Sequence, residues 1–116
     1  MAGRLAYLDT NDKPVLIYAT FPDIAAAEAA CGPLVEAGLA ACINLLPGMV
    51  SIYRWEGAMQ RDQECVAIIK TRRGMTEAAI AAAKSRHPYL TPAFLVIPVE
   101  GGLPAYLNWL MAGTRG

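Results

Sequence analysis

The only histidine of the chain, His87, is its first candidate for a metal ligand. Imidazole binds metal ions near neutral pH, and Pro88 and Pro92 restrict the backbone that follows it. The thiol of Cys42 is a second candidate, for a soft metal ion. A complete site takes three or four donors, so the pair needs a carboxylate or a neighbouring subunit. Two alternatives stay open: His87 ends a helix and hydrogen-bonds its carbonyls, and Cys42 is a packed core thiol.

Four other side chains predict a ligand cleft. Glu64 and Lys70 fall on one face of a predicted strand. Together with Trp55 and Tyr89 they offer a carboxylate, a cation and aromatic walls, a set that suits a small anion or a polar metabolite. The alternative is that the charges are rim groups or ion pairs between subunits and that the rings supply packing area.

Catalysis finds little support in the sequence. Cys42 as nucleophile and His87 as base form the one pair that we consider. The chain has no GxSxG motif and no metal-hydrolase spacing, and Gly101-Gly102 is typical of a turn rather than of a phosphate loop. We therefore expect a protein that is not an enzyme.

The composition favours a single domain with a partner surface. Hydrophobic residues make up 55% of the 116 residues and charged residues 17%, so one small core cannot hide all the apolar surface. The net charge is zero and no basic cluster exceeds Arg72-Arg73, which argues against binding to nucleic acid or to an anionic membrane. No apolar run reaches the length of a membrane span, and no signal-peptide core begins the chain. Three cysteines without CxxC spacing are typical of reduced thiols, so we expect a cytoplasmic protein.

Residues 1–13 show no sustained pattern, and we expect a loose lead-in there, followed by one domain at 14–116. In that domain, apolar runs predict strands and alanine-rich segments predict helices. The predicted strands are Val15–Phe21, Leu39–Gly57, Glu64–Thr71 and Phe94–Val99, and the predicted helices are Asp23–Gly38, Met75–Arg86 and Leu103–Met111.

Prolines interrupt three of these elements. Pro47-Gly48 cannot continue a regular ladder, so we expect a bulge or a sharp bend in the long strand. Gly32-Pro33 predicts a kink or a break in the first helix. Pro98 predicts an edge position or a bulge for the last strand.

The order of elements is strand, helix, strand, strand, helix, strand. It predicts an α+β fold, a ferredoxin-like βαββαβ sandwich, here with a bent long hairpin and a short C-terminal helix. Two helices cover only one face of such a sheet, yet the strands at 15–21 and 94–99 are apolar on both faces. We therefore expect copies of the chain to associate through the open face.

Several segments in this order resemble the CutA1 family of divalent-cation tolerance proteins. The resemblance covers about residues 14–111. It lies in LAACIN (39–44), the Pro47-Gly48 break, SIYRWEG (51–57), IIKT (68–71), HPYLTP (87–92) and YLNWL (106–110). It implies a homotrimer in which long strands of three subunits pack around a threefold axis, as in PII-type signalling proteins. It also implies a protein that binds or responds to divalent metal ions such as copper.

Three positions depart from the copper-binding members of that family. Ala19 stands where a cysteine can occur, Arg86 where a second histidine can precede His87, and Ala93 where many members have an acidic residue. Each departure removes one donor. The alternative function is a trimeric PII-like signalling or scaffold module that binds a small anionic metabolite or a protein partner in clefts between subunits.

Overall fold

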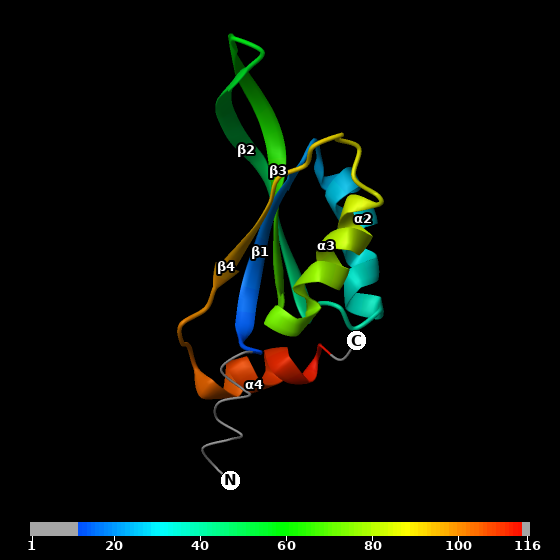
Figure 1. Ribbon diagram of the computed structural model, residues 1–116, viewed down its shortest axis with the longest axis vertical. Helices are drawn as coiled ribbons and strands as arrows, with labels where there is room; N and C mark the ends of the chain where they lie inside the picture. The colour runs from blue at the N-terminus through cyan, green and yellow to red at the C-terminus, as the bar shows by residue number, and fades with distance from the viewer. Residues whose placement is uncertain (1–11, 115–116) are drawn as a thin grey trace.

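The structure, a computed structural model, describes residues 12–114 and confirms the predicted fold class (Figure 1). Its strands are β1 (Pro14–Phe21), β2 (Cys42–Trp55), β3 (Ala58–Arg72) and β4 (Phe94–Pro98), and its helices are α2 (Ile24–Glu36), the 3₁₀ turn Arg73–Met75, α3 (Thr76–Lys84) and α4 (Pro104–Ala112). The strands form one antiparallel sheet in the order β2-β3-β1-β4. Residues 1–11 of the predicted lead-in and residues 115–116 of the predicted domain lie outside the described residues.

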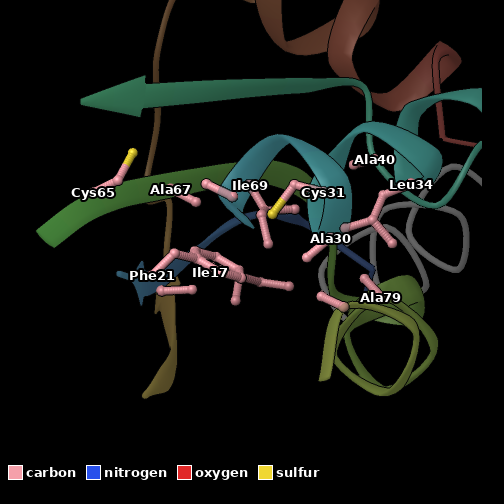
Figure 2. Close-up of a cluster of buried hydrophobic side chains, with 13 residues drawn as sticks. Ile17, Phe21, Ala30, Cys31, Leu34, Ala40, Cys65, Ala67, Ile69 and Ala79 are labelled. Atoms are coloured by element: carbon pink, nitrogen blue, oxygen red, sulfur yellow. The ribbon is translucent and has the colours of Figure 1, made fainter. Parts of the chain in front are cut away.

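The core lies between one face of the sheet and the helices α2 and α3 (Figure 2). Alternate residues of β1, among them Ile17 and Phe21, are fully buried on this face. Small side chains on the helices, such as Ala30 and Ala79, let the helix backbones lie close to the strands. Leu16 and Tyr18 of β1 point to the opposite face, which we call the open face because α2 and α3 do not cover it.

β2 and β3 form a long hairpin that projects beyond the helices (Figure 1). The predicted bulge is confirmed: the pairing with β3 shifts between Leu46 and Met49, and Gly48 has a φ of +82°. At the tip, Glu56 and Gly57 both have positive φ and join paired strand ends, as in a two-residue type I′ turn.

Two strands begin three or more residues away from the predicted start, and the other strand boundaries agree within two residues. β3 begins at Ala58 rather than Glu64, because the polar residues 60–63 are held by the ladder to β2 and, with only Ala58 and Met59 before them, carry no alternating apolar signal of their own. β2 begins at Cys42 rather than Leu39. The amides of Leu39 and Ala40 instead donate to the Leu34 carbonyl at the end of α2.

α2 runs from Ile24 to Glu36 without a break, although Pro33 lies inside it. Proline clashes with the Cβ atom of the residue before it when that residue is helical. Gly32 has no Cβ atom, so this clash is absent. The predicted break is therefore not observed. α3 ends at Lys84 instead of Arg86, because the amides of Arg86 and His87 bond to carbonyls three residues back and tighten the last turn.

β4 occupies an edge of the sheet and ends at Pro98, which confirms the predicted edge position.

At the N-terminal end of the described residues, Asp12 accepts hydrogen bonds from the Arg72 side chain at 3.0 Å and from the Gly74 amide at 2.9 Å. Arg72 also donates to Thr114 at 2.8 Å. One side chain of β3 thus joins both ends of the described residues to the sheet.

We predict that Gly48→Ala lowers the free energy of unfolding by about 1–2 kcal/mol, the cost of placing a Cβ atom in the left-handed region. No atom lies within 4 Å of that Cβ position, so the effect isolates backbone strain from crowding. Gly101→Ala is the matched control, because its Cβ position is equally open and its φ is not left-handed. Urea denaturation at one protein concentration measures both variants. Equal midpoints for the two variants would contradict the assignment of strain to the bulge.

Candidate functional site

A groove of about 830 Å³ lies at the point where the hairpin leaves the sheet. It is lined by side chains of β1, β2 and β3 and by the loop that precedes β4: Tyr18, Thr20, Ser51, Ile52, Tyr53, Trp55, Asp62, Glu64, Pro88, Tyr89, Leu90, Thr91 and Ala93. The register places most of its strand residues on the open face, opposite the core. The groove is therefore a product of the face that the helices leave uncovered.

Tyrosine hydroxyls hold the two carboxylates of the groove. Tyr89 donates to Oε2 of Glu64 at 2.8 Å, and Ser51 donates to Oε1 of the same carboxylate at 2.7 Å. The Tyr53 hydroxyl on β2 donates to the carboxylate of Asp62, which lies two residues before Glu64 on β3. Both carboxylates thus have fixed orientations along one face of β3.

These bonds have an electrostatic consequence for the phenols. Burial, followed by the hydrogen bond to Glu64, raises the pKa of Tyr89 above its ordinary value. The hydrogen bond to Asp62 is the main cause that raises the pKa of Tyr53. Both hydroxyls therefore keep their protons at neutral pH and remain donors to the carboxylates.

His87 lies beside the groove and orients the loop that forms one wall. Its ring stacks on Phe21 with centroids 4.3 Å apart, and its Nε2 lies 2.7 Å from the carbonyl oxygen of Thr20. Its Nδ1 accepts from the Tyr89 amide at 3.1 Å. An amide can only donate, so the geometry assigns the proton to Nε2. Both ring nitrogens are engaged in this arrangement, and neither bond goes to the helix carbonyls.

The structure does not bring Cys42 and His87 together. Cys42 lies opposite Lys70 in the hairpin, whereas His87 bonds to Thr20, whose partner in β3 is Val66. Four residues of strand separate these rows, a distance of about 13 Å. Across the described residues 12–114, no group of three or more His, Cys, Asp or Glu side chains gathers in one place.

The four side chains predicted to form one ligand cleft are also separated in the structure. Trp55, Glu64 and Tyr89 all line the groove, but Lys70 does not. Lys70 lies six residues from Glu64 along β3, about 20 Å away. Its ammonium group donates to the Tyr106 hydroxyl at 3.0 Å, and this bond is the main cause that raises the pKa of Lys70.

Sequence reasoning missed Ser51, Tyr53 and Asp62. Ser51 pairs with Asp62 in the hairpin, and Tyr53 follows two residues later on the same face. The alternation of Ser51, Tyr53 and Trp55 was a usable signal. It could not be combined with Asp62 because the predicted return strand began only at Glu64.

Two of the three cysteines are buried in the core. Cys31 and Cys65 have no exposed surface, and burial raises the pKa of the Cys31 thiol to about 11. Cys65 shares its buried face with Ala67 and Ile69. Cys42 is half-buried on the open face, and all three thiols are free.

No helix among the described residues is long and apolar enough to cross a membrane.

The sequence and the fold match one family over almost the whole described chain. A profile of the CutA1 divalent ion tolerance protein family matches residues 15–113. "Divalent-cation tolerance protein CutA" of Pectobacterium atrosepticum is 42% identical over 90% of this chain and 99% of its own length. "Protein CutA 1, chloroplastic" of Oryza sativa is 36% identical over 98% of this chain, which spans 64% of that longer protein. The crystal structure of CutA from Xylella fastidiosa has a TM-score of 0.85 and 40% identity, covering 89% of this chain and 99% of that one.

We predict that Tyr89→Phe lowers the free energy of unfolding at pH 7 by about 0.5–1 kcal/mol, as expected for a partly exposed hydrogen bond to Glu64. The folded-state pKa of Tyr89 is raised, so its contribution is complete below the unfolded-state pKa of about 10 and is lost as pH rises through the higher folded-state value. The difference between the two proteins should therefore shrink above pH 10. Urea denaturation from pH 7 to 11 measures it, and parallel stability curves would contradict the assignment.

Proposed function

The chain belongs to the CutA1 divalent ion tolerance family, and on this premise we propose that it takes part in tolerance to divalent metal ions. The observation that carries the proposal is the family match over residues 15–113. This range includes all four strands of the sheet except Pro14, the first residue of β1. A bacterial relative of nearly the same length bears the name of a divalent-cation tolerance protein. The role proposed is weak binding of the ion or a response to it.

Copper is the ion that we propose, because imidazole and thiol donors favour it. His87 and Cys42 are the candidate donors, but they lie about 13 Å apart along the sheet of one chain. An ion held by His87 must also replace one of the two hydrogen bonds of its ring. A copper site of useful affinity therefore needs further donors from a neighbouring copy.

A homotrimer is the assembly that would supply such a neighbour. The hairpin projects from the body of the chain (Figure 1), and a hairpin without further packing is only marginally stable in water. Large apolar side chains are exposed along it: Ile52 is 68% exposed, Trp55 58% and Met59 61%. On the edge strand, Leu95 is 61% exposed. Packing of these surfaces between three copies would remove them from water and close the open face.

We also propose a role without catalysis, in the cytoplasm. Cys42 and His87, the one pair considered as nucleophile and base, lie on rows of the sheet about 13 Å apart. The three free thiols favour a reducing compartment.

The alternative, a module that binds an anionic metabolite, is less well supported. Asp62 and Glu64 give the groove negative charge, and Lys70 lies outside it. An anion placed there would meet like charge.

We predict that titration calorimetry of the purified protein detects saturable binding of Cu²⁺ that weakens at least about tenfold in His87→Gln, a loss typical of a damaged metal site. The glutamine amide can still donate to the Thr20 carbonyl, so the substitution spares one native bond. Cys42→Ser tests the second donor in the same way. Glu28→Gln on the exposed side of α2 is the control. Binding that is absent, or equal in all four proteins, would contradict the copper proposal.

We predict that Trp55→Ala weakens assembly by roughly 2–4 kcal/mol, as truncation of an aromatic interface residue commonly does. Sedimentation velocity over a dilution series should show a trimer for the unchanged protein and dissociation of the variant at higher concentration. Trp109→Ala is the matched control, because this tryptophan is 53% exposed but lies on α4, at the end of the molecule opposite the hairpin tip (Figure 1). A monomeric unchanged protein, or a variant that stays trimeric at every dilution, would refute the proposed interface.

A further inference from the structure

We propose that helix α4 is a releasable strap across one end of the open face, and that the side chain of Arg72 is the latch that holds this strap closed. The inference goes beyond the proposed role in metal tolerance and does not depend on it. It rests on where α4 meets the sheet, on how little of the helix is buried and on the hydrogen bonds that attach it.

α4 lies at the end of the sheet opposite the hairpin tip (Figure 1). Two cations of β3 reach it there. Lys70 pairs with Leu16 of β1 and Arg72 pairs with Pro14, so both side chains are on the open face. Lys70 donates to the Tyr106 hydroxyl of α4 at 3.0 Å. α4 therefore meets the sheet at the end of its open face, which α2 and α3 do not cover.

Little of α4 itself is buried. The structure describes all nine of its residues, and only Leu110 among them is buried. Tyr106 is 40% exposed and Trp109 53%, and no side chain caps the N-terminus at Leu103. An isolated helix of this length is marginal in water. The helix therefore depends on its attachments to the sheet.

Arg72 supplies the attachment at the C-terminal end of α4. Its Nη2 donates to the Met111 carbonyl in the last turn, and its Nε donates to Oγ1 of Thr114 at 2.8 Å. A cation at this end also interacts favourably with the helix dipole. Nη1 donates to Asp12 at 3.0 Å, which holds the guanidinium group in place. Rotation of this one side chain would break both bonds to the end of the helix together.

The segment between β4 and α4 can act as a hinge, because it contains the pair Gly101-Gly102. A Cβ atom at Gly101 would meet nothing within 4 Å, so no packed neighbour restrains the backbone there. Rotation about the hinge would release α4 as one unit while the sheet stays paired. The open strap would expose Leu110 and free Lys70 and Arg72. This end of the open face would then present two cations and additional apolar surface.

Hydrogen–deuterium exchange followed by NMR tests the proposal on the full-length protein in its own assembly state. The amides of Leu107 and Gly113, which bond within α4, should exchange at least tenfold faster than the amide of Ile17 in β1. Arg72→Met should speed the α4 amides about a further tenfold or more and leave Ile17 unchanged, as expected when hydrogen bonds to a charged group are lost. Arg73→Met removes the same charge one residue later, and this matched control should change neither.

Three results would overturn the inference. The first is exchange of the α4 amides as slow as that of the core strands in the unchanged protein. The second is exchange of α4 that Arg72→Met does not alter. The third is equal acceleration of α4 and the core strands in that variant, because Arg72 would then support the whole fold rather than the strap.

Tyr106→Phe keeps the inference testable if Arg72→Met fails to fold. It removes the hydrogen bond to Lys70 and keeps the ring that stacks on Trp109 with centroids 5.5 Å apart. The α4 amides should exchange roughly two- to tenfold faster, the effect of one ordinary hydrogen bond, and the core strands should not change. An unchanged α4 in this variant would contradict the proposed attachment.

Discussion

Burial of only one face of the four-stranded sheet is the constraint on which the rest of this structure depends. Helices α2 and α3 cover the face that carries Ile17 and Phe21, and their alanines allow a close approach. The opposite face keeps its side chains available for ligands and for other chains. The groove and the exposed Trp55 follow from this arrangement, whereas Ile52 and Met59 are exposed because the hairpin projects beyond the helices.

The loop before β4 links the buried and the open faces. His87 stacks on Phe21 and bonds to the Thr20 carbonyl, so its position is set from β1. Two residues later, Tyr89 reaches Glu64 on the open face. The histidine therefore acts on the groove through the loop backbone. This role differs from that of a free metal donor, although the same ring nitrogens would serve both.

The character of the site depends on which charges the register brings together. Glu64 and Lys70 share a face of β3, and from spacing alone they belong to one cleft. The strand is extended, however, so six residues place them about 20 Å apart. Asp62 is the nearer neighbour of Glu64, and it turns a cleft expected to hold an anion into one with negative charge.

The sequence by itself determined the fold class, the bulge at Pro47-Gly48 and the buried strands, because apolar runs and prolines act locally. It also identified Trp55, Glu64 and Tyr89, which do line one groove. Only the tertiary structure decided that residues 58–63, most of them polar, form a strand and that Cys42 and His87 lie on different rows of the sheet. The physical reason is that pairing with a neighbouring strand sets both the length of β3 and the register, and neither is encoded in the residues of one segment.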